Sequence, residues 1–318
     1  MRIPMRHTLA FLFLLIASTV FAQEKSLSTG LIFPEGIKVE KVWTGGEFTE
    51  GPAYGKDHCV YFSDIGNRIM KFDPATKSTI EFRNPSGRSN GLDFDSMGRL
   101  VAAEGANTGG NRRITRTEKD GKITVIADSY EGKKFNSPND LVIHSKQRIY
   151  FTDPRYVGKE PRELDHESVF MISSTGKVSI ATKECKKPNG IVISPDEKIL
   201  YVAENDPQGN KQLVSFKISD DGSLGVKNVL YDFGKSRGID GMCVDEKGNI
   251  FATAGTGKET GVYVFNPMGK VIDFINTPET SSNCIFGGKD RNILYITAGI
   301  SLYRIQANTR GYHLCWPD

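Results

Sequence analysis

The sequence predicts an all-β protein of the six-bladed β-propeller class, with a metal site at the mouth of its central channel. A dipeptide of Asn, Asp or Glu followed by a small or polar residue recurs six times, at intervals of 40, 49, 50, 51 and 43 residues. Alternating apolar segments rich in β-branched and aromatic residues follow the six dipeptides. No stretch longer than the N-terminal segment shows the spacing of a helix. Intervals of about 40–50 residues are typical of propeller blades, whose radial repetition avoids long exposed strand edges.

The first 22 residues have the layout of an export signal. Arg2 and Arg6 precede an apolar run at residues 9–16, and the small residues that lead to Ala22 form a cleavage site. This run is short for a bilayer span, and no later segment approaches the ~20 apolar residues of a transmembrane helix, so a retained N-terminal anchor is the weaker alternative. We expect residues 1–22 to be removed on export to a periplasm or to the medium, and residues 23–318 to form one propeller domain without a membrane attachment.

Net charge and cysteine content limit the binding partners and the cysteine chemistry that the sequence predicts. The formal net charge of +3 falls to +1 when the two arginines of residues 1–22 are removed, so nothing favours nucleic acid or an anionic membrane as a partner. The five cysteines contain no CxxC pair, which argues against a zinc knuckle or a redox motif. Their odd number leaves at least one free thiol. An oxidising compartment would allow one or two disulfides, with Cys315 in the tail as a candidate partner, while the pairing and the oligomeric state stay open.

Each dipeptide begins a strand–turn–strand unit. The expected inner strands include residues 92–95, 141–144, 191–194 and 242–245, followed by the turns SMGR, SKQR, PDEK and EKGN. The expected second strands include residues 100–104, 149–153, 200–204 and 250–254, and outer strands follow, for example at 114–117 with 122–127 and at 262–266 with 270–275. A single Asn-Gly or Asp-Gly pair is most simply a tight turn, because such pairs tolerate positive φ. Six pairs in register indicate a repeated structural position.

The residue that begins each inner strand is expected to point into one mouth of the channel. The six blades then predict a ring of oxygen-bearing side chains, Glu50, Asn90, Asn139, Asn189, Asp240 and Asn283. Two carboxylates balance one divalent cation, and amide oxygens complete its shell. Because the ring lacks His and Cys, we expect Ca²⁺ first, with Mg²⁺, Mn²⁺ or Zn²⁺ as alternatives. A water-filled polar channel is the other interpretation, and it is disfavoured because converging buried carboxylates repel one another.

A second set of acids ends the second strands, namely Asp64, Glu104, Asp153 and Glu204. These strands run back toward the same mouth, so the acids are expected to orient the amide ligands or to bind a ligand rich in hydroxyl groups. We expect substrate contacts from Glu104 and Asp153 together with Asn90, Asn139 and Asn283. Strand-end polarity that faces water is the ordinary alternative for each acid.

Several segments resemble one known family. TEGPAY (Thr49–Tyr54), SNGLDFDSMGRL with NRRITR, NSPNDLV with IYFTDPRY, KPNGIVISPDEKILYVAEN, and DGMCVDEKGNIFAT occur in this order. Together they are similar to the senescence marker protein/gluconolactonase (regucalcin-like) family from about Glu47 to Arg304. The resemblance implies a six-bladed propeller with one catalytic metal that hydrolyses sugar lactones such as gluconolactone, on an architecture shared with diisopropyl fluorophosphatase and the paraoxonases.

The resemblance also implies site residues. Glu50, Asn189 and Asp240 match the family's metal ligands, and Asn139 matches a position that binds metal or substrate. The segment EGANTGGNRR, residues 104–113, is longer than the family's usual Glu-His-Gly-Asn-Arg-Arg. Insertions at a propeller mouth alter substrate choice, so the substrate is the property of this chain that the family resemblance predicts least well.

This chemistry predicts metal-assisted lactone hydrolysis. The ion would polarise the lactone carbonyl, and Asp240 would act as general base for the attacking water; direct nucleophilic attack by Asp240 is the open alternative. Two other functions compete. An organophosphate or arylester hydrolase of the paraoxonase form would need histidines near the metal, whereas all five histidines fall outside the ring positions. A non-catalytic ligand-binding propeller shares the fold but has no need of two carboxylates at its mouth.

Overall fold

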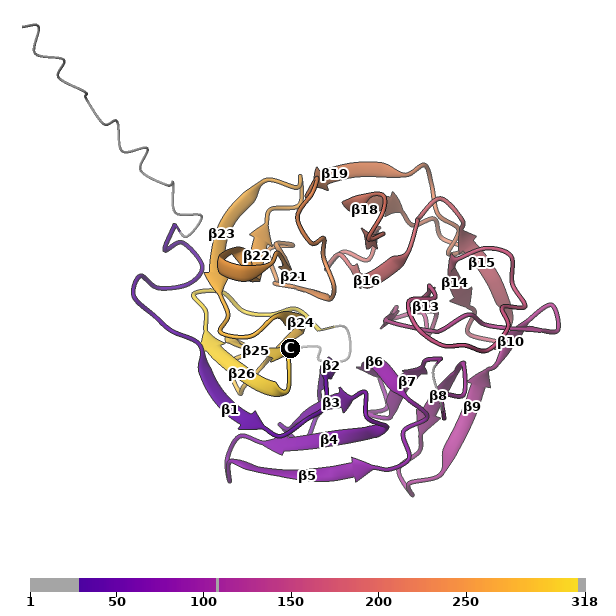
Figure 1. Cartoon of the computed structure of the whole chain (residues 1–318), viewed down its shortest axis with the longest axis horizontal. Helices are drawn as coiled ribbons and strands as arrows, with labels where there is room; N and C mark the ends of the chain where they lie inside the picture. Colours follow the sequence, from indigo (N-terminus) through magenta and orange to yellow (C-terminus); the bar gives the residue numbers. More distant parts are fainter. Residues whose placement is uncertain (1–28, 107–108, 314–318) are drawn as a thin grey trace, which may run out of the picture.

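The computed structural model describes residues 29–106 and 109–313, so the expected signal peptide at residues 1–22 and Cys315 lie outside the described residues. Six four-stranded antiparallel sheets are arranged around a central channel (Figure 1), which confirms the predicted all-β six-bladed propeller. The described ranges contain one helical turn, η1 (Gly257–Glu259), and hold no helix long and apolar enough to cross a membrane.

In the first five blades the strands run outward from the channel in chain order. The blades comprise β2 (Thr49–Tyr54), β3 (Val60–Asp64), β4 (Arg68–Asp73) and β5 (Ser78–Arg83); β6 (Ser89–Phe94), β7 (Leu100–Glu104), β8 (Arg113–Thr117) and β9 (Ile123–Ala127); β12 (Leu141–Ile143), β13 (Ile149–Asp153), β14 (Ser168–Ile172) and β15 (Val178–Thr182); β16 (Pro188–Ile193), β17 (Ile199–Asn205), β18 (Lys211–Lys217) and β19 (Asn228–Asp232); β20 (Met242–Val244), β21 (Ile250–Ala254), β22 (Gly261–Phe265) and β23 (Val271–Asn276). A short hairpin of β10 (Ser129–Tyr130) and β11 (Lys133–Lys134) lies between the second and third blades.

The sixth blade is built from both ends of the described chain. Its inner strands are β24 (Ser281–Gly287), β25 (Ile293–Ala298) and β26 (Ser301–Gln306), and its outer strand is β1 (Glu40–Thr44). β1 pairs antiparallel with β26, with Thr44 opposite Ser301 and Glu40 opposite Arg304. This pairing closes the ring of blades, so each blade has a neighbour on both sides.

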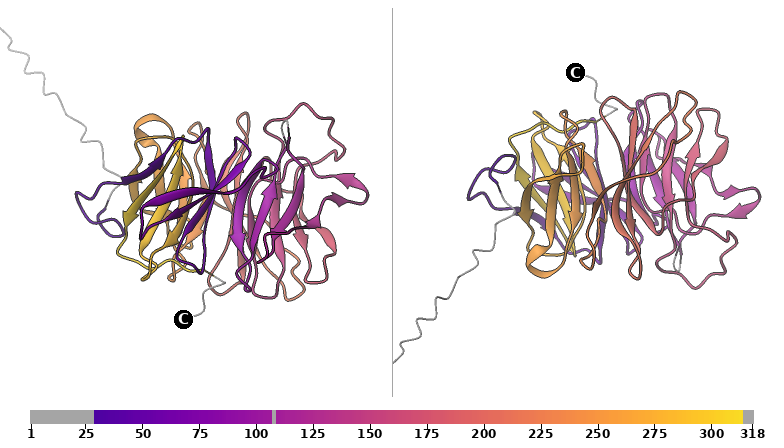
Figure 2. Two further views of the ribbon diagram at one scale, coloured as in Figure 1. Left: turned by 90° about the horizontal axis from the view of Figure 1, so that it is seen from below. Right: turned by 90° about the horizontal axis from the view of Figure 1, so that it is seen from above.

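Apolar side chains pack between adjacent blades and hold them together. Between the second and third blades, for example, the ring of Phe135 lies 5.0 Å from that of Phe151 and 5.3 Å from that of Phe170, and all three are fully buried. Each such side chain stabilises the fold by about 1.5–3 kcal/mol relative to an exposed one. Figure 2 shows the strands crossing the thickness of a disc, so the connecting loops gather on its two faces.

The expected disulfides do not form among the described cysteines. Cys59, Cys185, Cys243 and Cys284 are buried free thiols. Cys243 on β20 of the fifth blade and Cys284 on β24 of the sixth blade lie close together, with their Sγ atoms 3.6 Å apart. Burial raises the pKa of the Cys185 thiol to about 12, so it stays protonated.

Candidate functional site

Five of the six predicted ring residues meet at one mouth of the channel. Glu50, Asn90, Asn139, Asn189 and Asp240 all line a cavity of about 450 Å³ there. Each belongs to the innermost strand of its blade or stands two residues before its start. The blade repeat read from the sequence therefore places these side chains correctly in space.

The sixth position is one residue earlier than predicted. Asn139, Asp240 and Ser282 use their backbone oxygens in the same way, accepting the N–H of a glycine from the preceding blade at 2.7, 2.6 and 2.8 Å. Ser282 is therefore the counterpart of the ring residues in the sixth blade. Asn283 is not part of this cavity's lining, and its Nδ2 donates to Asp140 Oδ2 at 3.3 Å, so the substrate contact expected of Asn283 stays a prediction.

The glycine after a ring residue is needed for close packing of neighbouring blades. A Cβ on Gly190 would lie 2.4 Å from the backbone oxygen of Asp240, and one on Gly91 would lie 2.3 Å from Asp140 Oδ1. Only Gly51 among these dipeptide glycines has positive φ, at 42°. The Asn-Gly and Asp-Gly pairs are therefore mostly contact points between blades rather than tight turns.

Hydroxyl groups on the second strands tie neighbouring blades together at the same level. Ser63 Oγ donates to the backbone oxygen of Asn90 at 2.7 Å, and Thr152 Oγ1 donates to that of Asn189 at 2.8 Å. Both hydroxyl-bearing residues are fully buried. The backbones of Asn90 and Asn189 are thus each held by the blade before them, at the edge of the cavity that both residues line.

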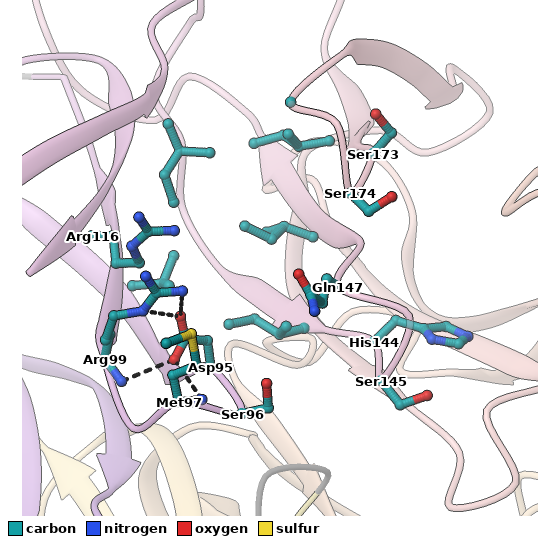
Figure 3. Close-up of a pocket in the computed structure, with 16 residues that line it drawn as sticks. Asp95, Ser96, Met97, Arg99, Arg116, His144, Ser145, Gln147, Ser173 and Ser174 are labelled. Atoms are coloured by element: carbon teal, nitrogen blue, oxygen red, sulfur yellow. Dashed lines mark hydrogen bonds and ion pairs between the residues drawn. The ribbon is translucent and has the colours of Figure 1, made fainter. Parts of the chain in front are cut away.

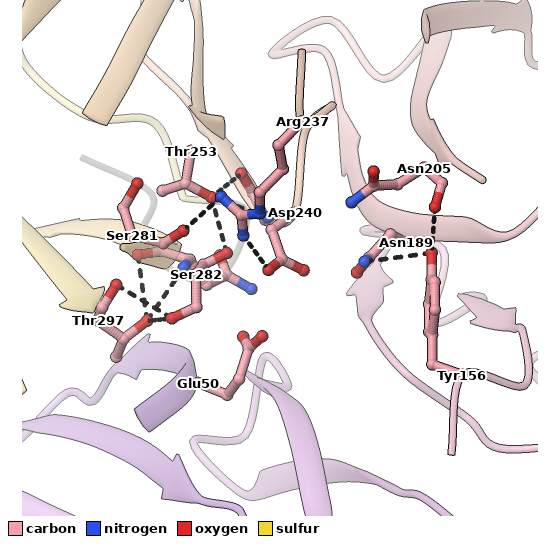
Figure 4. Close-up of polar contacts among 12 residues, drawn as sticks. Glu50, Tyr156, Asn189, Asn205, Arg237, Asp240, Thr253, Ser281, Ser282 and Thr297 are labelled. Atoms are coloured by element: carbon pink, nitrogen blue, oxygen red, sulfur yellow. Dashed lines mark hydrogen bonds and ion pairs between the residues drawn. The ribbon is translucent and has the colours of Figure 1, made fainter. Parts of the chain in front are cut away.

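The two ring carboxylates lie close enough to influence each other. Glu50 accepts a hydrogen bond from the backbone N–H of Gly51 at 3.0 Å, and Figure 4 shows its carboxylate pointing toward that of Asp240. Burial, and then the charge of Asp240, raise the pKa of Glu50 well above its ordinary value. Burial also raises the pKa of Asp240, although Arg237 opposes this by donating to its Oδ2 and by its charge. Added positive charge at the site would therefore stabilise the ionised form of both carboxylates.

The amide ring member Asn189 is held from one side by an aromatic residue. Asn189 Nδ2 donates to the hydroxyl of Tyr156 at 3.4 Å, and this hydroxyl donates to the backbone oxygens of Lys187 and Asn205 at 2.9 and 3.2 Å. Figure 4 shows Asn189 between Tyr156 and the open centre of the ring. With Nδ2 engaged by Tyr156, Oδ1 is the amide atom available to a cation.

The acids that end the second strands fix the loops in front of the ring residues. Asp153 accepts the backbone N–H groups of Asn136 and Ser137 at 2.8 and 2.7 Å. Asp64 does the same for Glu47 and Phe48 at 2.8 and 3.1 Å. The alternative that these acids face water is wrong, because Asp64, Glu104, Asp153 and Glu204 are all fully buried.

Glu104 is the centre of a buried ionic cluster. Its carboxylate accepts from Arg83, from Arg113 at 2.8 Å, from Asn111 at 2.6 Å and from Thr115 at 2.8 Å. Neither Glu104 nor Asp153 lines the cavity. The substrate contacts expected of these two acids stay predictions, and in the structure their oxygens accept hydrogen bonds from the surrounding residues.

The donor set fits a hard divalent cation. Glu50, Asp240, Asn139 and Asn189 all line the cavity, and their carboxylate and amide oxygens are ligands of the kind that suits Ca²⁺ or Mg²⁺. Across the described residues, no three His, Cys, Asp or Glu side chains gather as a metal cluster. Any cation at this mouth would thus depend on amide oxygens in addition to the two carboxylates.

Two residues of the site, Arg237 and Tyr156, were not predicted from the sequence. Arg237 is paired with Asp240, and its Nη1 also donates to the backbone oxygen of Ser281 at 3.0 Å. Tyr156 supports Asn189 from a loop of another blade. Arg237 stands three residues before Asp240, a spacing that suggests a local ion pair only once the loop geometry is known, and the position of Tyr156 has no sequence signal.

A second pocket lies at the other end of the blades and is separate from the ring. Its lining includes Asp95, Arg99, His144 and Ser173 (Figure 3). Asp95 follows the end of β6, whereas Asn90 stands near its beginning, so the pocket and the ring lie at opposite ends of the strand. Arg99 is already paired with Asp95 at 2.7 Å and Glu118 at 3.3 Å.

The fold and the site together define a six-bladed β-propeller with an oxygen-lined cavity at one mouth of its channel. The model of the SMP-30/Gluconolactonase/LRE-like region matches residues 48–300. The chain belongs to this family, as its motifs predicted.

Individual relatives agree with this assignment. The chain is 30% identical to a gluconolactonase of Zymomonas mobilis over 303 residues, covering 86% of this chain and 82% of the relative. A solved gluconolactonase structure from Xanthomonas campestris is 29% identical, with a TM-score of 0.76, covering 85% of this chain and 89% of the other. A calcium-binding regucalcin from Agrobacterium tumefaciens shares the fold, with a TM-score of 0.72 at 18% identity, covering 89% and 97% of the two chains.

Proposed function

We propose that this protein is an exported, metal-dependent hydrolase of a sugar lactone of the gluconolactone type. One observation carries the proposal: the carboxylates of the buried Glu50 and the partly buried Asp240 point toward each other in an open cavity that amide side chains also line. Membership of a family that includes gluconolactonases supports the lactone as substrate.

Glu50, Asn139, Asn189 and Asp240 would hold the ion. Ca²⁺ is the first candidate because all four donors are oxygen atoms, with Mg²⁺, Mn²⁺ or Zn²⁺ as alternatives. A bound divalent cation would supply Lewis-acid polarisation of the lactone carbonyl. The raised pKa of Glu50 and of Asp240 without a cation is the physical reason for the fit, since each carboxylate gains from added positive charge.

Asp240 is the proposed general base. Arg237 holds its Oδ2, which fixes the plane of the carboxylate beside the cavity. A carboxylate held in this way can accept the proton of a water that attacks the lactone carbonyl. Asn90 and Asn139 line the same cavity and would offer amide groups to the hydroxyls of a sugar lactone.

The test measures proton release from D-glucono-1,5-lactone after chelation and after the return of each cation, with the spontaneous rate subtracted. Asp240→Asn removes the base, and Asp232→Asn on the exposed edge of β19 is the matched control. We expect activity to depend on added metal, to be lost in Asp240→Asn and to be kept in Asp232→Asn. Calorimetric titration of the same samples reports metal binding separately. Full activity in the chelated protein or in Asp240→Asn would refute the proposal.

Export is a separate part of the proposal and rests on residues 1–22. We expect the mature protein to begin at Gln23 when it is expressed with its full leader. N-terminal sequencing of protein recovered from the periplasm or medium tests this. An intact leader on the recovered protein would favour the membrane-anchored alternative.

A further inference from the structure

The cavity changes character from its floor to its entrance. The floor carries the ring oxygens, whereas Phe48, Ile65, Ala106 and Val157 line the cavity with hydrocarbon. Among these, Phe48 is 39% exposed and Val157 is 56% exposed, and the neighbouring Tyr156 is 37% exposed. Large apolar side chains that stay in contact with water around a cavity commonly mark a surface that a ligand covers.

The polar groups of this entrance are already engaged. The hydroxyl of Tyr156 donates to backbone oxygens and accepts from Asn189, so its aromatic ring is what the residue offers to a ligand. Arg88, which also lines the cavity, donates from Nη1 to the backbone oxygen of Ile65 at 2.8 Å. Each of these two polar groups therefore already has a partner within the protein.

Phe48 and Tyr156, two residues of the apolar wall, are held in place by contacts within the protein. The backbone N–H of Phe48 donates to the fully buried Asp64, and the backbone N–H of Ile65 donates to the Phe48 oxygen at 2.9 Å. On the other side, Lys187 Nζ lies 5.5 Å from the centre of the Tyr156 ring and donates to Glu167 at 2.7 Å. A wall fixed before binding loses little conformational entropy when a ligand covers it.

We propose that the entrance selects lactones that carry an alkyl substituent, with the lactone group at the ring and the alkyl chain against Phe48, Tyr156 and Val157. This inference rests on the proposed lactonase function and assigns its substrate class. Bare aldonolactones would leave the apolar wall in water, whereas an alkyl chain would cover it. Each methylene fully removed from water is expected to raise kcat/KM up to about fourfold.

The test compares kcat/KM for γ-lactones of five, seven, nine and eleven carbons in the metal-supplemented protein, with D-glucono-1,5-lactone as reference. We expect the nine-carbon lactone to exceed the five-carbon one by at least about tenfold. Val157→Ser and Phe48→Ser should each lower this ratio by about threefold or more. Val226→Ser is the matched control, because Val226 is 88% exposed and lies outside the cavity, and it should keep the wild-type ratio.

The outcomes separate the two claims. Hydrolysis of D-glucono-1,5-lactone without a gain along the alkyl series would overturn the inference and leave the proposed function intact. An alkyl preference that Val157→Ser and Phe48→Ser do not reduce would also overturn it, because the apolar wall would then not be its source. Failure to hydrolyse any lactone in the panel would overturn the proposed function and the inference with it.

Discussion

Replacement of Gly190 by Ala should separate the fourth and fifth blades at the candidate site. The added Cβ would lie 2.4 Å from the backbone oxygen of Asp240 and 2.9 Å from the Cα of Gly241, where ordinary contacts begin at 3.4 Å. Both neighbours are backbone atoms, so the blades must move apart by about 1 Å, because a close-packed interior leaves no other space. Overpacking of this kind costs about 3 kcal/mol. The shift also displaces Asp240, and a misplacement of about 1 Å lowers activity by about 100-fold.

Urea unfolding followed by tryptophan fluorescence measures the stability loss, and lactone hydrolysis measures the functional loss. Gly225→Ala is the matched control, since its Cβ would meet Lys217 Cβ at an ordinary 3.5 Å. We expect the control to stay within about 1 kcal/mol of the wild type. A Gly190→Ala protein with the wild-type urea midpoint and wild-type activity would show that the blades do not need glycine for their approach.

Three further perturbations follow from the buried polar groups. Glu104→Gln removes the counter-charge of Arg83 and should lower the free energy of unfolding by about 3 kcal/mol, and an unchanged urea midpoint would contradict this. Burial raises the pKa of Asp153 from 3.8 to about 7, so the folded state keeps a proton that the unfolded chain releases above about pH 4. The contribution of Asp153 to stability therefore decreases as the pH rises from about 4 to 7, and urea titrations at several pH values should show a weaker decrease in Asp153→Asn. Thr152→Val removes the 2.8 Å bond to the Asn189 backbone and should cost about 1 kcal/mol and weaken calcium binding in calorimetry; equal affinity would mean that Asn189 needs no such support.

The sequence was sufficient for the blades and for most of the ring because both depend on a local repeat. A strand that lines the channel begins at the same point in every blade, so Glu50, Asn90, Asn139, Asn189 and Asp240 could be placed from spacing alone. The sixth blade departs from this rule, since the backbone oxygen that accepts the Gly241 N–H there belongs to Ser282, one residue before Asn283, and the repeat carries no sign of this offset.

The roles of the outer acids were beyond reach of the sequence for a different reason. Whether Glu104 or Asp153 meets a ligand depends on which backbone N–H groups and arginines surround it, and these come from loops and neighbouring strands rather than from the repeat. Arg237 and Tyr156 were missed on the same ground. Their functions arise where separate blades meet, whereas the motifs describe one blade at a time.

The shared sixth blade sets an order on how the molecule is made. Ser301 Oγ donates to Thr44 Oγ1 across a sequence separation of 257 residues, so the ribosome must finish nearly the whole chain before β1 finds its partner. Until then β1 is an unpaired strand and the first blade faces no neighbour on one side. A chain cut short before β26 could complete five sheets and still have an open ring, with edges that invite pairing between copies. The disc of six blades can therefore close only after β26 has been synthesised.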